Sequence, residues 1–86
     1  MEISEQIRAF ITSNFYLPDP AVLQNDMSLL DGGIIDSTGV LEVIAFIEDN
    51  FDTTVEDSEM LPENLDSIER ITNFITRKRA DKKAFF

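Results

Sequence analysis

Apolar side chains recur every three or four residues in three stretches of the chain, which is the spacing of one face of an α-helix. These stretches cover residues 2–15, residues 36–51 and residues 68–79. No stretch alternates apolar and polar residues long enough to predict a β-strand, so the sequence predicts an all-α fold. The expected core positions are Ile3, Ile7, Phe10, Ile11 and Phe15, then Val40, Leu41, Ile44, Ile47 and Phe51, then Ile68, Ile71 and Ile75 with Phe74 beside them.

The connections show where the helices end and begin. Residues 17–20 contain two prolines, which end the first helix because proline lacks an amide donor and restricts the residue before it. A long loop follows, in which the pair Leu29-Leu30 is expected to pack on the core. The second helix then begins at Asp36 or Ser37, either of which can cap the free amides of its first turn.

The region between the second and last long helices predicts one short element. Residues 55–61 are acidic and compatible with one or two helical turns, which Pro62 is expected to end. Residues 66–69 read Asp-Ser-Ile-Glu, which predicts a capped start of the last helix resembling a capping box. The predicted fold is therefore a small bundle of three main helices plus one short helix, with residues 1–79 as one small domain and 80–86 as a flexible C-terminal tail.

Two apolar residues of the second helix lie outside the simple stripe. Val43 and Phe46 widen its apolar surface, while Glu48 and other acids lie off the stripe. One interpretation places both residues in a flank packed against the long loop. The other makes them a partly exposed surface for a partner, and the pattern leaves both interpretations open.

The net negative charge of the chain favours some classes of binding partner over others. The 86 residues have a net charge of −10, and residues 1–76 contain two basic and sixteen acidic side chains. Such a surface repels nucleic acid phosphates and attracts basic protein surfaces. Five basic residues lie near the C-terminus, where we interpret them as a solvated helix end that complements the helix dipole. No apolar run approaches the ~20 residues of a membrane span, and the acidic start is unlike a secretory signal, so a cytoplasmic protein is expected.

The residue types present restrict the chemistry that Ser37 could perform. The chain has no histidine and no cysteine, which excludes a serine–histidine triad, disulfides and thiolate metal sites. Residues 26–36 lack the spacing of a calcium loop, so no metal site is predicted. Gly32-Gly33 lacks the lysine and spacing of a phosphate-binding loop, so no nucleotide motif is predicted. Ser37 can instead be modified by another protein, or it can serve only as a helix cap.

Across about residues 3–76 the chain resembles acyl carrier proteins. The matching features are Leu29-Leu30-Asp31, the Gly-x-x-Asp-Ser element at residues 33–37, the acidic second helix through Phe51, and Asp66-Ser67-Ile68. The resemblance implies that a phosphopantetheinyl transferase, using magnesium and coenzyme A, attaches 4′-phosphopantetheine to Ser37, next to Asp36. The arm would then hold acyl or aminoacyl groups as thioesters, and the protein itself would be non-catalytic.

The resemblance also implies where partners bind. Partner enzymes with basic surfaces would dock on the second helix, and the matching positions are Thr38, Glu42, Ala45 and Glu48. The expected partners are an adenylating ligase and acyltransferase or synthase enzymes, with the carrier as a monomer. Candidate contacts of the arm or its cargo, with core packing as the alternative role, are Leu41, Val43, Phe46 and Ile68.

One departure from the family pattern concerns the pathway. The usual Asp-Ser-Leu reads Asp-Ser-Thr here because Thr38 replaces the leucine. This favours a specialised, free-standing carrier over one for housekeeping fatty-acid synthesis, with fatty-acid-like, polyketide and other biosynthesis left open. An alternative function is an unmodified acidic interaction module with the carrier fold. A catalytic role has little support.

Overall fold

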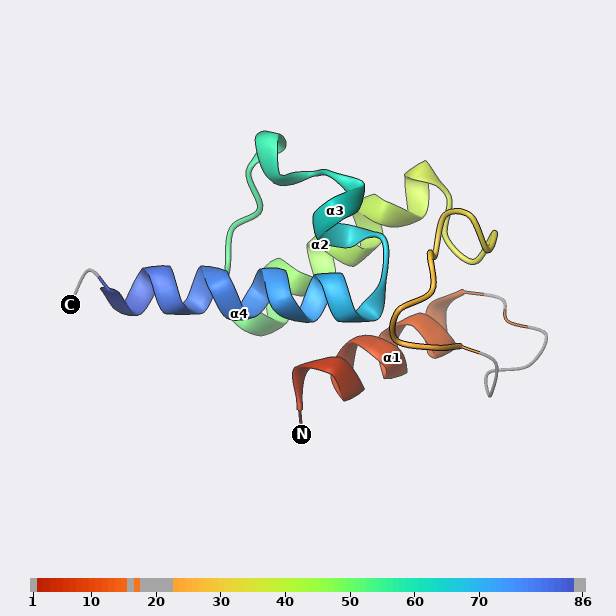
Figure 1. Ribbon diagram of the computed structural model, residues 1–86, viewed down its shortest axis with the longest axis horizontal. Coiled ribbons are helices and arrows are strands. Elements are labelled where there is room, and N and C mark those ends of the chain that lie inside the picture. The colour runs from red at the N-terminus through yellow and green to blue at the C-terminus, as the bar shows by residue number, and fades with distance from the viewer. Residues whose placement is uncertain (1, 16, 18–22, 85–86) are drawn as a thin grey trace.

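The computed structural model describes residues 2–15, 17 and 23–84, and side chains as far as residue 80. In this part of the chain all regular structure is helical, which confirms the predicted all-α fold. Figure 1 shows α4 along the length of the molecule, with α1 and α3 packed against it. The elements in chain order are α1 (Ile3–Asn14), α2 (Ser37–Phe51), the 3₁₀-helix η2 (Asp57–Glu59), α3 (Pro62–Leu65) and α4 (Ile68–Ala84).

The long helices meet in one apolar core. Helix α1 contributes Ile7 and Ile11, and α4 contributes a buried stripe of three isoleucines and Phe74, as the periodicity predicted. The loop between α1 and α2 also packs on this core, through Leu23, Leu29 and Ile35. Within the described part of the chain, the buried hydrophobic residues are Ile7, Ile11, Leu23, Leu29, Ile35, Val43, Ile44, Ile47, Phe51, Val55, Leu65, Ile68, Ile71, Phe74 and Ile75.

The buried face of α2 differs by one position from the prediction. Val43 is in the core at 2% exposure, whereas Leu41 is 59% exposed. The reason is geometric: Val40, Val43 and Ile47 follow the 3–4–7 spacing of one helix face, and each step turns the side chain by about 100°. Leu41 is therefore directed away from the core, so its prediction as a core residue was wrong.

Phe46 packs against helix α1. Its ring stacks on Phe10 of α1 with centroids 4.3 Å apart and an interplanar angle of 23°. An edge contact at 5.8 Å joins it to the buried Phe51. Phe46 therefore links α2 to α1, while part of its surface faces solvent.

The loop between α1 and α2 is tied to the start of α4. The backbone N–H of Leu29 donates to the carbonyl of Asp66 at 2.7 Å, and the N–H of Glu69 donates to Asn25 at 2.8 Å. Arg8 of α1 donates to the carbonyl of Leu23 and to the Asn25 side chain. These contacts explain how so long a loop is held, because its backbone groups have partners on two helices. The prolines expected to end α1 lie outside the described residues.

The helical turn predicted within residues 55–61 is present as η2, and a second short helix, α3, follows it. Residues 57–59 form only η2, and Pro62 opens α3 instead of ending a helix. Proline is tolerated at the first helical position because the amide it lacks would have no partner within the helix. The prediction that Pro62 closes the short helix was therefore wrong, although a short helix between α2 and α4 does occur.

Helix α4 has its predicted capped start within residues 66–69, but it ends later than predicted. Ser67 provides the cap, because its hydroxyl oxygen accepts from the N–H of Arg70 at 3.0 Å. Helical backbone continues to Ala84, beyond the predicted end at about Arg79. Residues 85 and 86 lie outside the described part, so the flexible tail at 80–86 stays a prediction. In the described residues no helix has both the length and the apolar character needed to cross a membrane.

Candidate functional site

Ser37 is the first residue of α2, and its hydroxyl is exposed. The cap of the helix is Asp36, whose Oδ1 accepts from the N–H of Gly39 at 2.7 Å. Among the described residues the Ser37 hydroxyl makes no hydrogen bond, so it is not needed to start the helix. The amides of the first turn and the helix dipole favour an anionic group at this position.

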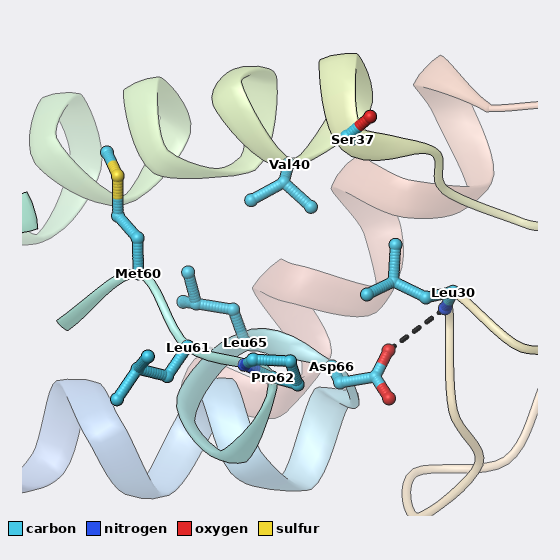
Figure 2. Close-up of a pocket in the computed structure, with 8 residues that line it drawn as sticks. All are labelled: Leu30, Ser37, Val40, Met60, Leu61, Pro62, Leu65 and Asp66. Atoms are coloured by element: carbon cyan, nitrogen blue, oxygen red, sulfur yellow. Dashed lines mark hydrogen bonds between the residues drawn. The ribbon is translucent and has the colours of Figure 1, made fainter. Parts of the chain in front are cut away.

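A groove of about 210 Å³ begins beside Ser37. Figure 2 shows Val40 and Ser37 on the α2 side, with Leu61 and Pro62 on the opposite side. The Ser37 hydroxyl lies at the edge of the groove and is turned outward. The walls are largely apolar, with lining residues Leu30, Ser37, Val40, Met60, Leu61, Pro62, Leu65 and Asp66.

Asp66 closes one end of the groove. Its Oδ1 accepts from the N–H of Leu30 at 2.9 Å, and its Oδ2 accepts from the Ser28 hydroxyl (Figure 2 draws the first bond). Leu30 is thereby held at the groove with 38% of its surface exposed, so only Leu29 of the predicted pair is a core residue. Asp66 belongs to the segment predicted to cap α4, but Ser67 provides that cap and the Asp66 side chain reaches back to the loop.

Gly39 allows the first turn of α2 to pack closely against its surroundings. A Cβ at this position would lie 2.8 Å from Cε1 of Phe15 and 2.9 Å from Cγ2 of Ile35. Both distances are shorter than side chains tolerate without moving. The glycine that looked unfavourable for a helix therefore fixes where the Ser37 end of α2 sits against the end of α1.

Polar contacts from α4 hold the η2–α3 wall of the groove. Lys78 forms an ion pair with Glu59 at 2.8 Å, and Arg77 donates to Oδ1 of Asn64 at 2.9 Å. Asn64 in turn donates to the carbonyl of Glu59 at 3.0 Å. The hydrogen bond from Lys78 lowers the pKa of the Glu59 carboxyl, and a backbone N–H from Glu56 acts in the same direction.

These contacts revise the interpretation of the basic helix end. Arg77 and Arg79 are exposed, as the predicted solvated helix end requires, and Lys78 is half-buried, but all three also make specific contacts. Arg79 lies over the ring of Phe51, with its guanidinium carbon 5.4 Å from the ring centre. The sequence showed the positive charges but gave no sign of which residues across the fold would face them.

The residues predicted to bind partners are all exposed on α2, but they do not form one group. Glu42 and Ala45 line a second groove, between α2 and α1. Glu48 instead accepts a hydrogen bond through Oε2 from the backbone N–H of Val55 at 3.0 Å. This bond holds the segment that follows α2 against the helix. Thr38 is exposed next to Ser37. None of these positions has a demonstrated partner, so the set stays a prediction.

The four residues predicted as candidate contacts of an arm or its cargo differ in their burial. Val43 and Ile68 are in the core, at 2% and 0% exposure, which agrees with the alternative role given to them. Leu41 is exposed, and it lies one helical turn after Ser37 on the same face. Met60 and Leu61 line the groove at 36% and 42% exposure and were not identified from the sequence. The available signal was a pair of apolar residues directly before Pro62 in an acidic segment.

No protein-family model matches the chain. A D-alanyl carrier protein from Streptococcus mutans is 30% identical to it over 79 residues, which cover 92% of this chain and 98% of the relative. The chain therefore belongs to the family of small, free-standing carrier proteins, as a specialised member related to acyl carrier proteins. It is a non-catalytic carrier that works with enzyme partners. This match gives no support to fatty-acid or polyketide biosynthesis as the setting.

Proposed function

We propose that this protein carries an aminoacyl group, D-alanyl first among the candidates, as a thioester on a 4′-phosphopantetheine arm attached to Ser37. The main support is the arrangement at the start of α2. Asp36 caps the helix, so the Ser37 hydroxyl is exposed and available for modification. The D-alanyl cargo is suggested by the relative from Streptococcus mutans.

The surroundings of Ser37 fit such an arm. A phosphodiester on Ser37 would lie at the N-terminus of a 15-residue helix, where a negative charge gains ~0.3–1 kcal/mol at an exposed site. The carboxylate of Asp36 opposes this gain in part. The apolar side chains of Val40 and Leu61 border the adjacent groove and suit the methyl and methylene groups of an arm. When attached, the arm supplies the thiol that holds the cargo.

The chain itself provides no base for this modification. It contains no histidine, and no carboxylate or amine is hydrogen-bonded to the Ser37 hydroxyl among the described residues. The phosphopantetheinyl transferase must therefore supply the base that removes the proton of the Ser37 hydroxyl. Ser37 contributes an exposed hydroxyl. Asp36 and Gly39 fix the position of that hydroxyl at the start of α2.

An intact-mass experiment tests the attachment. We expect the apo-protein, incubated with a broad-specificity transferase, coenzyme A and magnesium, to gain the mass of one phosphopantetheine group. Ser37→Ala should show no gain, while Ser58→Ala, which removes another exposed serine, should gain as much as wild type. An undiminished gain in Ser37→Ala would reject the site. No gain in wild type, with partner binding unchanged by Ser37→Ala, would favour the unmodified interaction module.

A second measurement tests the cargo separately. The arm-bearing protein is incubated with ATP, an adenylating ligase for D-alanine and either D-alanine or L-alanine, and the thioester is quantified by mass. We expect D-alanine to be transferred to the arm on Ser37. We expect no D-alanyl thioester on Ser37→Ala. Attachment of the arm without acceptance of D-alanine from this ligase would retain the carrier function and reject the proposed cargo.

A further inference from the structure

Helix α4 continues beyond the apolar core. Among the described side chains of this helix the last buried one is Ile75, and helical backbone runs on to Ala84, about 13 Å further along the axis. Figure 1 shows this end of α4 projecting past the other elements of the fold. We propose that the projecting end of α4, residues 76–84, binds the surface of a membrane that contains anionic lipids.

The charge of the projecting end is opposite to that of the rest of the chain. Residues 77–83 have five basic side chains and one acidic side chain, whereas residues 1–76 have two basic and sixteen acidic ones. Each Lys or Arg near an anionic lipid surface strengthens binding about fivefold. The acidic body is repelled by the same surface, but such forces are largely screened beyond about 8 Å at physiological ionic strength. Because the projecting end is longer than this, its attraction exceeds the repulsion of the body.

The sequence of the projecting end is unsuited to packing against another helix. The buried stripe of α4 runs through Ile71 and Ile75 with a spacing of three and four residues, and the same spacing next falls on Lys78 and Lys82. The only apolar residues among positions 76–84 are two alanines. An apolar helix face would therefore bury little surface here, so a partner of this segment has to recognise its charge.

The described cations of the projecting end differ in how far the fold already occupies them. Lys78 is half-buried and paired with Glu59, so it mainly holds the fold together. Arg77 and Arg79 are exposed. Arg77 uses one nitrogen to donate to Asn64, and a guanidinium has five N–H donors in a planar fork that suits phosphate oxygens. Both arginines can therefore contact lipid phosphates while their contacts within the protein persist.

Two aromatic residues favour a lipid surface over a nucleic acid. In the sequence Phe85 and Phe86 directly follow the basic segment, although they lie outside the described residues. Basic side chains combined with phenylalanine are typical of segments that lie in the interface of a membrane, where the rings reach the acyl region. A nucleic acid duplex offers no such apolar region, and its extended phosphate backbone would also face the acidic body.

Binding through the projecting end would leave the candidate functional site accessible. Figure 1 shows the start of α2, where Ser37 lies, and the end of α4 at opposite ends of the molecule, whose longest dimension is 45 Å. A protein held to a bilayer by α4 would therefore present Ser37 away from the lipid surface. The proposal does not require an arm on Ser37, so it stands or falls independently of the carrier function proposed above.

Vesicle sedimentation tests the proposal with the unmodified full chain. The probe is a set of sucrose-loaded vesicles of phosphatidylcholine with about 30% phosphatidylglycerol, and vesicles of phosphatidylcholine alone are the reference. We expect the protein to sediment with the anionic vesicles at about 0.05 M salt and to be released at about 0.5 M. Absence of sedimentation with the anionic vesicles at low salt, or equal sedimentation with both kinds, would overturn the proposal.

A charge-matched pair of variants locates the contact. Lys82→Gln combined with Lys83→Gln removes two positive charges from the projecting end and should weaken binding about 25-fold. Ser13→Asp combined with Gln24→Glu shifts the net charge equally at two exposed positions outside α4, and it should change binding by less than about twofold. Equal losses in the two double variants would mean that net charge alone governs binding, and the projecting end would be rejected as the contact.

A third double variant separates a lipid surface from other polyanions. Phe85→Ser combined with Phe86→Ser keeps every charge and should weaken vesicle binding about tenfold. Wild-type protein should bind duplex DNA of the same phosphate concentration more weakly than the anionic vesicles. Unchanged vesicle binding by the phenylalanine variant, or equally tight binding of DNA, would indicate a general polyanion contact and overturn the assignment to a membrane surface.

Discussion

The two walls of the groove at Ser37 are held in different ways. On one side, α2 places Val43, Ile44 and Ile47 in the core across a 15-residue helix. On the other side, α3 has four residues and buries only Leu65. Two α4 side chains contact α3 directly, because Arg77 donates to Asn64 and Arg70 donates to the carbonyl of Pro62, while Lys78 pairs with Glu59 of the preceding η2.

The energies of these two kinds of support differ in size. Fully burying one large aliphatic side chain contributes about 1.5–3 kcal/mol, whereas a partly exposed ion pair contributes about 0–1 kcal/mol. The position of Ser37 therefore depends on the core and should be lost only when the whole domain unfolds. The α3 wall can open by local loss of a few polar contacts. With Ser37 as the proposed attachment point, this division would keep that point fixed while the opposite wall adjusts.

The α2 wall is tested by removing core volume. Ile47→Ala should lower the free energy of unfolding by about 2–5 kcal/mol, because Ile47 is 0% exposed and its loss leaves a cavity. Leu41→Ala on the same helix is the control and should change it by no more than about 0.5 kcal/mol. Urea unfolding followed by circular dichroism measures both variants. Similar small losses in the two would mean that burial does not fix α2.

The α3 wall is tested by removing the Lys78 ion pair. Lys78→Met should reduce global stability by only about 0–1 kcal/mol, since the paired side chains are 24% and 26% exposed. Hydrogen exchange of the α3 amides, such as the Leu65 N–H bonded to the carbonyl of Leu61 at 3.0 Å, should accelerate about two- to fivefold.

Arg79→Met is the matched control for this experiment. It also removes one positive charge from α4, but Arg79 contacts Phe51 of α2 and not the α3 wall. We expect exchange in α3 to be unchanged by this substitution. If the two variants accelerate exchange in α3 equally, general charge on α4 rather than the specific ion pair holds the wall.

The smallest expected effect is on pH dependence. Lys78 lowers the pKa of Glu59 in the folded protein below its ordinary value of 4.5. The resulting stabilisation is fully present above pH 4.5 and is lost as the pH falls through the lowered folded value. An NMR titration of the Glu59 side chain should show this lowered pKa, and Lys78→Met should raise it. A Glu59 pKa at or above the ordinary value in wild type would contradict the ion pair.

Helical periodicity was enough to predict the three long helices, because their buried stripes follow residues three and four apart. Periodicity did not identify the buried face of α2 correctly, because apolar residues there fit more than one helix face. Leu41 and Val43 are both apolar neighbours of the stripe, and only the true rotation of α2 separates them. Pro62 was misassigned because proline both ends helices and starts them, and the local sequence does not distinguish the two uses.

The candidate site was predicted in part. The Asp36-Ser37 step was identifiable from its spacing, but which of the two residues caps α2 required the geometry. The groove residues Leu30 and Asp66 are 36 positions apart, and the bond between them depends on tertiary packing that no local pattern encodes. The contacts of Arg77 and Lys78 were missed for the same reason.

Because Asp36 rather than Ser37 caps α2, the proposed modification of Ser37 would leave the cap of the helix unchanged. Modification of Ser37 removes no hydrogen bond on which the first turn depends, since the Gly39 N–H is held by Asp36. Empty, arm-bearing and cargo-bearing forms would thus offer partner enzymes the same helix. An enzyme that must tell a loaded carrier from an empty one would then have to sense the arm and its cargo themselves, not a rearrangement of the protein around them.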